Sequence, residues 1–140
     1  MPKPVYLQSA VIPYRHKDQA LQVLLVSNLR KSRWVIPKGL VEEGFSAAAS
    51  AEKEALEEAG ITGTVNEEKI GTYTYQKWGG TCHVEVFLMK VTGEMTKWAE
   101  SSRSRRWMTL EAARKRVDEP GLKAILARVP ALLEEGKGTP

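Results

Sequence analysis

Three glutamates near the middle of the 140-residue chain are spaced so that a helix would bring them together. They are Glu54, Glu57 and Glu58. Residues three and four apart lie on one side of a helix, where like charges repel by roughly 0.2–0.5 kcal/mol per pair. Lys53 alone cannot neutralise three carboxylates. A hard divalent cation could, and a ligand set of oxygens suits Mg²⁺ or Mn²⁺ better than zinc. A solvated acidic helix without metal is the alternative.

The segment that must position these glutamates is a glycine-bounded loop running into a helix. Ser46 is a suitable N-cap, and Gly60 stands where a left-handed C-terminal residue is favoured. Pro37 and Gly39 oppose an earlier start. We therefore predict a helix over residues 46–59. Small residues form its inner stripe, with Leu56 at the edge: Ala48, Ala51, Ala55 and Ala59.

Residues 39–61 resemble the Nudix box, in which Gly, five residues, Glu and seven residues precede Arg-Glu-apolar-x-Glu-Glu-x-Gly-apolar. The positions in register are Gly39, Glu54, Ala55, Glu57, Glu58, Gly60 and Ile61. Two positions depart, because Phe45 stands for the first glutamate and Lys53 for the arginine. So long a pattern is far more specific than a lone glycine motif. It implies an α/β Nudix fold, a mixed β-sheet sandwiched between α-helices. We expect residues 1–140 to form one such domain, with 136–140 as a frayed tail.

The resemblance also implies roles for individual residues. The catalytic residues would be Glu54, Glu57 and Lys53, with Lys53 orienting Glu57 without the forked donor of arginine. The metal ligands would be Glu54, Glu57, Glu58 and the backbone carbonyl of Lys38. Glu54 is ligand or general base. Some family members use a base outside the box, so Glu100 and Glu85 are further candidates.

Basic residues gather in two segments that could hold phosphates. The first precedes the box and contains Arg30, Lys31, Arg33 and Lys38, and the second contains Arg103, Arg105 and Arg106. The net charge of +4 and the pI near 9.2 favour anionic ligands. The segment from Arg33 to Gly39 and the residues Trp98-Ala-Glu100 and Arg106-Trp107 resemble the diphosphoinositol polyphosphate phosphohydrolase group. Bacterial relatives of that group also act on dinucleoside polyphosphates. By this resemblance the substrate contacts would be Arg33, Lys38, Gly39, Arg105 and Arg106.

The sequence therefore predicts a Mg²⁺- or Mn²⁺-dependent hydrolase of a pyrophosphate linkage in a phosphorylated small molecule. The substrate would be a diphosphoinositol polyphosphate or a dinucleoside polyphosphate. Two alternatives stay open: an RNA 5′-pyrophosphohydrolase, and a Nudix-fold binding module in which Phe45 and Lys53 mark lost catalysis. Nucleic acid is not the favoured partner, because no RNA-binding aromatic signature or helix-turn-helix pattern is visible.

The distribution of apolar and basic residues indicates where in the cell the protein is expected. The chain has no apolar run of 18 residues and no basic-then-apolar start, so we expect a cytoplasmic protein without a membrane span. One cysteine, Cys82, excludes an internal disulfide.

The hydrophobic pattern predicts the remaining elements. Strands are expected at 5–12, 22–27, 34–36 and 106–108, and a hairpin at 69–78 and 81–91 around Gly79-Gly80. Further helices are expected from a Thr109 cap to about residue 117, and over 121–134 with a bend at Pro130. We expect a turn at 13–19, loops at 28–32 and 93–105, and a connection at 62–68.

Overall fold

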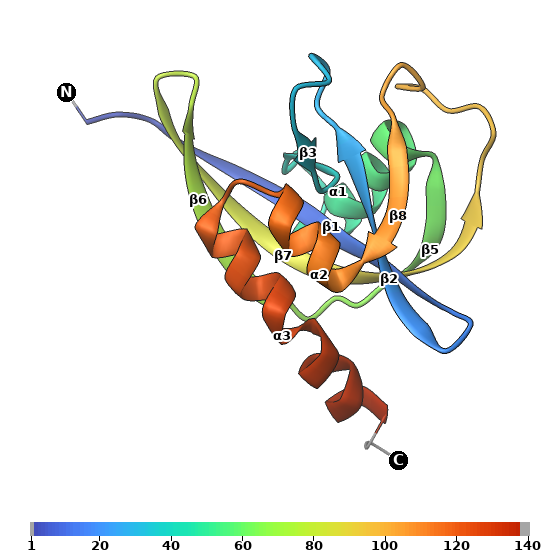
Figure 1. Cartoon of the computed structure of the whole chain (residues 1–140). Coiled ribbons are helices and arrows are strands. Elements are labelled where there is room, and N and C mark those ends of the chain that lie inside the picture. The colour runs from blue at the N-terminus through green and yellow to red at the C-terminus, as the bar shows by residue number, and fades with distance from the viewer. Residues whose placement is uncertain (1, 138–140) are drawn as a thin grey trace.

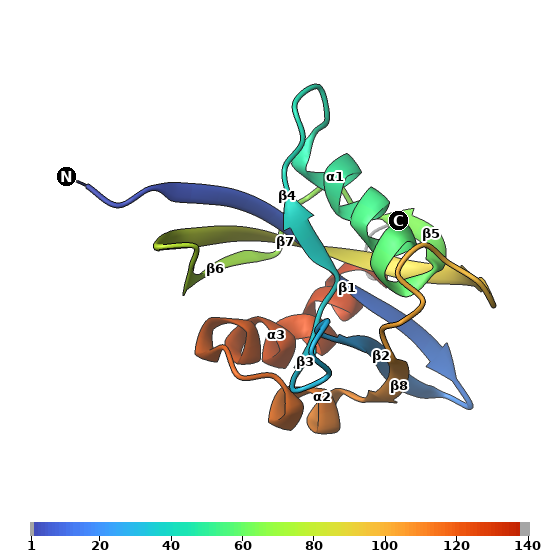
Figure 2. The ribbon, with the colours of Figure 1, turned by 90° about the horizontal axis from the view of Figure 1, so that it is seen from above.

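The structure, a computed structural model, describes residues 2–137. A mixed sheet of eight strands lies between one helix on one face and two helices on the other (Figure 1, Figure 2). The strands are β1 (Val5–Lys17), β2 (Ala20–Ser27), β3 (Trp34–Val35), β4 (Lys38–Leu40), β5 (Ile61–Val65), β6 (Gly71–Lys77), β7 (Gly80–Glu94) and β8 (Arg105–Thr109). The helices are α1 (Ala47–Glu54), the π-helical turn η1 (Ala55–Ala59), α2 (Leu110–Arg116) and α3 (Pro120–Lys137). The predicted α/β sandwich is confirmed.

The two long strands β1 and β7 pair in parallel and form the centre of the sheet. The strand order is β3-β2-β1-β7-β5, with β8 on β2, β4 on β1 and β6 on β7. Strand β1 changes partner along its length, since residues 8–10 pair with β4 and residues 14–17 pair with β2. This change of partner sets β4 beside the middle of the sheet, next to helix α1.

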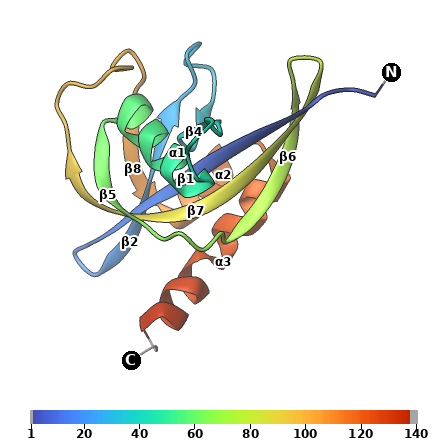
Figure 3. The same cartoon turned by 180° about the vertical axis from the view of Figure 1, so that it is seen from behind.

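Each face of the sheet has its own apolar core. The face under α2 and α3 buries alternate residues such as Ile12, Val84 and Val86. The opposite face, which α1 covers in Figure 3, buries Val11 and Phe87. The predicted alanine stripe of the helix packs into this second core, and all four of its members are buried. Alternation along the strands thus predicted which residues meet which helix layer.

The predicted turn at residues 13–19 is wrong for most of its length. Strand β1 continues through it to Lys17, because residues 14–17 pair with residues 20–23 of β2. Only Asp18 and Gln19 turn, with φ of 52° and 66°. Two left-handed residues form the tight hairpin turn whose twist matches the flanking strands. The pairing with β2 and β7 outweighs the local signal of Pro13 and the charged residues after it.

The predicted connection at residues 62–68 is also wrong, because it begins with strand β5 paired to the end of β7. Gly63 suggested a break, but it lies at a shift of register, where a Cβ would come within 2.0 Å of the Lys90 carbonyl oxygen. Glycine here permits close approach of two strands. Strand β7 likewise extends to Glu94, which shortens the predicted loop at 93–105.

The C-terminal helices follow the prediction closely. The Thr109 side chain caps α2 by accepting from the Ala112 amide at 3.1 Å. Helix α3 is longer than the predicted 121–134 and contains Pro130. Of the expected tail, residues 136 and 137 belong to this helix, and residues 138–140 lie outside the described part of the chain.

Candidate functional site

The helix that carries the three glutamates is closed at both ends by its own sequence. The Ser46 hydroxyl accepts a hydrogen bond from the Ala49 amide at 3.1 Å, and Gly60 adopts the left-handed conformation at φ 64°. Between these caps α1 continues into η1, which contains Glu57 and Glu58. Such π turns inside α-helices occur frequently at functional sites. The predicted limits, residues 46–59, are confirmed.

The backbone of strand β4 lies against the side of this helix that carries the glutamates. It pairs with β1 so that Gly39 lies opposite Ser9. The Lys38 amide donates a hydrogen bond to Oε1 of Glu58 at 3.3 Å. A Cβ on Gly39 would lie 2.3 Å from Cδ of Glu54. Only glycine therefore lets the strand pass this close to the Glu54 carboxyl.

Gly39→Ala should lower the turnover of the site while changing protein stability little. The three heavy atoms nearest to the new methyl all belong to the flexible side chain of Glu54, which can rotate away without moving backbone. Misplacing a reacting group by about 1 Å can cost about 100-fold in rate. The rate constant kcat and the thermal unfolding midpoint measure the two effects. Gly93→Ala is the matched control, because its Cβ would also meet only a side chain, the hydroxyl of Thr62 at 2.6 Å. Equal rate losses in both variants would contradict this account.

Glu58 is the most enclosed of the three glutamates, with 7% of its surface exposed. The guanidinium of Arg103 lies 3.7 Å from its carboxyl. Burial raises the pKa of the Glu58 carboxyl to about 8, even though Arg103 and Lys38 oppose that rise. Burial also lowers the pKa of the Lys38 ammonium. Additional positive charge beside Glu58 would favour its ionised form.

Glu54 and Glu57 have different surroundings. Burial, and after it the charge of Glu57, raises the pKa of the Glu54 carboxyl. Glu57 forms an ion pair with Lys53 at 3.4 Å, and Lys53 also contacts Glu42 at 2.8 Å. The ammonium of Lys53 thus lies between two carboxylates, which is the position expected of a residue that orients Glu57.

The glutamates match a hard cation in donor chemistry, although they do not form a closed ligand set. Glu54 and Glu58 both line the same cleft, whereas Glu57 is turned toward Lys53. Across the described part of the chain, no three His, Cys, Asp or Glu side chains come close enough to hold a metal ion. A metal would require the carboxylate of Glu57 to approach the other two carboxylates. Carboxylate and carbonyl oxygens are ligands that suit Mg²⁺ and Mn²⁺.

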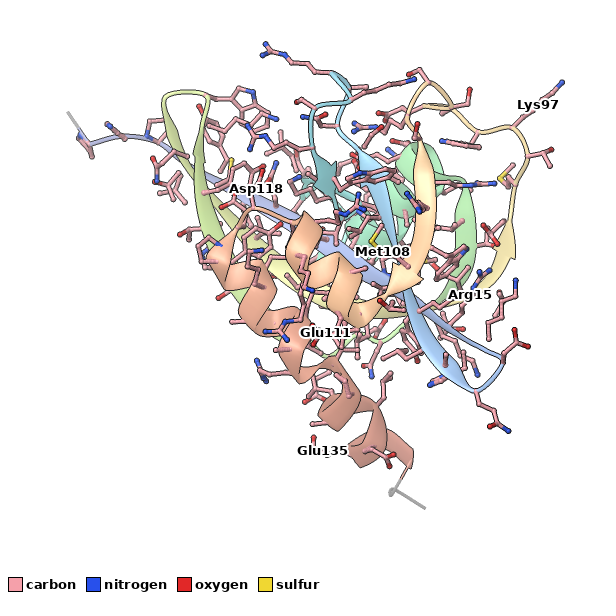
Figure 4. The ribbon with its side chains drawn as sticks, viewed as in Figure 1. Arg15, Lys97, Met108, Glu111, Asp118 and Glu135 are labelled. Atoms are coloured by element: carbon pink, nitrogen blue, oxygen red, sulfur yellow. The ribbon has the colours of Figure 1, made fainter. Side chains whose placement is uncertain are left out.

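A cleft of about 800 Å³ opens beside these glutamates. Its charged lining residues are Glu42, Glu54, Glu58, Arg30, Arg33, Lys38, Lys77 and Arg103. A second cavity, of about 260 Å³, shares Arg33, Lys38 and Lys77 with it. Arg33 forms an exposed ion pair at 3.8 Å with Asp118, which Figure 4 shows at the connection between α2 and α3. The cleft therefore sets cations against carboxylates, an arrangement that suits a polyphosphate.

The prediction that Arg105 and Arg106 contact the substrate does not fit their positions. The guanidinium of Arg105 donates to the carbonyl of Ala59 at 2.8 Å and to that of Met95 at 2.6 Å. Arg105 therefore connects the end of η1 to the loop that follows β7. Arg106 is exposed and pairs with Leu25, whose side chain belongs to the core on the far face of the sheet.

Arg103 is the residue of this basic segment that does line the cleft. Its guanidinium contacts Glu58, pairs with Glu100 at 2.9 Å and donates to the Ser27 carbonyl at 3.0 Å. The sequence showed the cluster but not which member turns inward, because that depends on how the loop docks. The Trp98 indole donates a hydrogen bond to the Glu58 carbonyl, and the Glu100 amide donates one to the Glu57 carbonyl, each at 2.9 Å. These two hydrogen bonds anchor the loop.

Arg105→Met should destabilise the fold by about 1.5–3 kcal/mol, the range for hydrogen bonds made by charged groups. The reason is that the carbonyls of Ala59 and Met95 would lose their donor. Chemical denaturation measures the change. Arg106→Met, which removes an exposed neighbour, should change stability by less than about 0.5 kcal/mol. Similar losses in both variants would show that Arg105 acts only through general charge.

The two candidate bases outside the box lie apart from the cleft lining. Glu85, on β7, pairs with Lys69 at 3.3 Å. Glu100 pairs with Arg103, and its charge still acts on Glu54. Neither belongs to the described residues that line the cleft, whereas Glu54 does. The geometry therefore favours Glu54 as the base.

Comparison with known proteins identifies a family whose domain model matches the chain. Residues 7–129 match the model of the NUDIX domain. The chain is similar to Nudix hydrolase 12, mitochondrial, of Arabidopsis thaliana, with 34% identity over 76% of this chain and 64% of that protein. It is 38% identical to Nudix hydrolase 4 of the same plant over 74% of this chain and 55% of that protein. The chain thus spans 64% of the length of the first relative and 55% of the length of the second.

A solved structure with the same architecture is the Ap4A hydrolase of C. elegans in a binary complex. The TM-score is 0.82 and the identity 25%, over 93% of this chain and 98% of that one. No helix among the described residues is long and apolar enough to cross a membrane. The match of the domain model to most of the chain, together with the box and the fold, shows that the chain belongs to the Nudix family.

Proposed function

We propose that this protein is a Mg²⁺- or Mn²⁺-dependent hydrolase of a pyrophosphate linkage in a phosphorylated small molecule. The observation that carries the proposal is the cleft in which Glu54 and Glu58 meet Lys38 and Arg103. A pyrophosphate linkage is anionic and repels hydroxide, so its hydrolysis requires neutralised oxygens, a positioned water and a stabilised leaving phosphate. The residues of the cleft supply groups for each of these tasks.

The proposed metal ligands are the carboxylates of Glu57 and Glu58 and the backbone carbonyl of Lys38. A metal held by these ligands would supply the Lewis acidity that activates a water and polarises a phosphoryl oxygen. Lys53 keeps Glu57 in place through its ion pair at 3.4 Å. Glu54 accepts the proton of the attacking water, because it lines the cleft and because burial raises the pKa of its carboxyl.

Phosphate oxygens are the proposed partners of the cations in the cleft. Arg33 can present two parallel N–H groups to a phosphate. Arg103 contributes its charge from the lining of the cleft, and Lys38 supplies a point charge that borders both cavities. The exposed ion pair between Arg33 and Asp118 would open to release Arg33 for this contact.

The proposed substrates are a diphosphoinositol polyphosphate or a dinucleoside polyphosphate. The second is supported by the similarity to the Ap4A hydrolase of C. elegans. We place the enzyme in the cytoplasm, as the sequence predicted.

The test is release of phosphate or nucleotide from a panel of anhydrides, with and without Mg²⁺. The panel holds a diphosphoinositol polyphosphate, diadenosine tetraphosphate, a nucleoside diphosphate sugar and 5′-triphosphorylated RNA. Metal-dependent turnover of either small-molecule class supports the proposal. Turnover of the RNA alone would overturn the substrate class.

A binding module is the second candidate, and one observation favours it. Phe45 replaces the first box glutamate and lies 45% exposed, so one carboxylate of the family pattern is missing. Under this hypothesis Mg²⁺ and a nucleotide raise the thermal unfolding temperature, but no member of the panel turns over.

A further inference from the structure

The end of the box helix, which is α1 together with η1, depends on a segment far along the chain. A helix leaves the carbonyls of its last four residues without partners inside the helix. Here these are residues 57–60, and residues 95–105 supply a donor to each of the four carbonyls. The pairs are Glu57 with the Glu100 amide at 2.9 Å, Glu58 with the Trp98 indole at 2.9 Å, Ala59 with the Arg105 guanidinium at 2.8 Å, and Gly60 with the Met95 amide at 2.7 Å. The segment therefore caps the turn that carries Glu57 and Glu58.

Trp98 is the central side chain of this cap, and its indole is held by two neighbours. A Cβ on Gly60 would lie 2.8 Å from Cβ, Cγ and Cδ2 of Trp98, so the indole lies directly against the glycine. The Arg105 guanidinium lies 4.1 Å from the centroid of the Trp98 ring, and it is itself fixed by the carbonyls of Ala59 and Met95. These contacts hold the indole where its N–H reaches the Glu58 carbonyl.

Glu58 is fixed by the same segment at its backbone and at its side chain. Trp98 binds the carbonyl, while the Arg103 guanidinium lies 3.7 Å from the carboxyl. The Lys38 amide donates to the other oxygen of that carboxyl at 3.3 Å. A π turn is rare and differs in hydrogen-bond register from the α-helix before it, so its carbonyls need donors from outside. The bond from Trp98 therefore helps to fix the turn from which the Glu58 carboxyl reaches the cleft.

We infer that Trp98 is a positioning residue for the metal site. Its indole N–H holds the Glu58 carbonyl and so keeps the Glu58 carboxyl where a hard divalent cation can bind it. The inference rests on the proposed function, in which Glu58 is a metal ligand, and in it Trp98 acts only through Glu58. Groups that orient a metal ligand from outside the ligand set typically contribute 10-fold to 100-fold to metal affinity or activity.

Trp98→Phe tests the inference, because phenylalanine keeps a ring between Gly60 and Arg105 but has no N–H to donate. The affinity for Mn²⁺, measured by calorimetric titration, should fall about tenfold to 100-fold. If the protein is a hydrolase, the Mg²⁺ concentration that gives half the maximal rate should rise by the same factor. The KM for the phosphorylated substrate should stay within about twofold, because the cations of the cleft are unchanged.

Trp107→Phe is the matched control. The Arg15 guanidinium lies 4.1 Å from the centroid of the Trp107 ring, and the Trp107 indole donates to Glu94 at 3.1 Å rather than to the helix. The control thus removes the same N–H from a tryptophan with the same kind of neighbour. Its Mn²⁺ affinity should stay within about twofold of wild type. Urea denaturation of both variants measures any general loss of stability.

The outcomes separate the inference from the proposed function. Equal Mn²⁺ affinities in wild type and Trp98→Phe would overturn the inference alone, and so would equal losses of affinity in the two variants. A wild type that binds no Mn²⁺ would overturn the proposed function and the inference together. Wild-type protein gives a further test that needs no variant to fold. In NMR spectra of the indole N–H groups, saturating Mg²⁺ should shift the Trp98 resonance more than that of Trp107, and an unmoved Trp98 resonance would contradict the inference.

Discussion

Glu54→Gln is expected to lower kcat by about 10²–10⁴-fold, the usual contribution of a positioned general base. Glutamine keeps the size of the side chain beside Gly39, so the fold should persist, but it cannot accept the proton of the attacking water. Because phosphate binding depends on the cations of the cleft, KM should change much less than kcat. Steady-state kinetics on the best substrate of the panel, with saturating Mg²⁺, measures both constants.

Glu52→Gln is the matched control, since it makes the same change at an exposed position of the same helix. Its kcat should stay within about twofold, as surface substitutions away from a site usually have small effects. Glu100→Gln separates the two assignments of the base. A loss of more than 100-fold in Glu100→Gln with less than tenfold in Glu54→Gln would move the base to the loop and contradict our assignment.

The sequence predicted the box helix well because every signal for it is local. Ser46 caps the start of the helix and Gly60 caps its end, each through contacts within a few residues. The alanine stripe follows from the helical period alone. The hairpin was predicted as well, although its two turn residues are Trp78 and Gly79 rather than Gly79 and Gly80, because Gly80 pairs with Lys77.

The predictions were wrong where pairing between strands that lie far apart in the sequence determines the structure. Residues 14–17 join β1 because β2 and β7 offer partners, and β5 forms because the end of β7 lacks a neighbour on that side. At the site, local pattern could show a basic cluster but not that Arg103 faces the cleft while Arg105 fastens the helix end. Side-chain direction in a loop is set by tertiary contacts, here the two bonds from Trp98 and Glu100.

In metal-free protein, stability should fall as pH rises from about 5 to about 8. The Glu58 carboxyl has a pKa of about 8 in the folded chain, against an ordinary value of 4.5. Between these values the folded state keeps a proton that the unfolded state has released, so each rise in pH favours unfolding. At about 1.4 kcal/mol per pH unit of displacement, the loss is roughly 3–5 kcal/mol. Burial raises the pKa of Glu54 as well, which acts in the same direction. Burial lowers the pKa of the Lys38 ammonium, which acts in the opposite direction.

Urea denaturation in EDTA at pH 5, 6, 7 and 8 measures this loss, and Glu58→Gln isolates its source. The variant carries no proton to release at this position, so its stability should fall much less across the same range, with the contribution of Glu54 remaining. A profile in which wild type and variant run parallel would show that Glu58 does not carry the dependence. Marginal stability of 5–15 kcal/mol makes a loss of this size easy to detect.

Mg²⁺ should reverse the loss, and the reversal distinguishes a metal site from a merely acidic helix. Protons and metal compete for the carboxylate oxygens, so a ligand of the folded state should stabilise the protein more at pH 8 than at pH 6. Lys53 and Arg103 already offset part of the repulsion among the glutamates, but burial still leaves Glu58 protonated near neutrality. An acidic helix that needed no further cation would show the same unfolding temperature with and without Mg²⁺ at both pH values. A stabilisation confined to high pH in wild type, and absent in Glu58→Gln, would instead identify the buried carboxylate as a ligand.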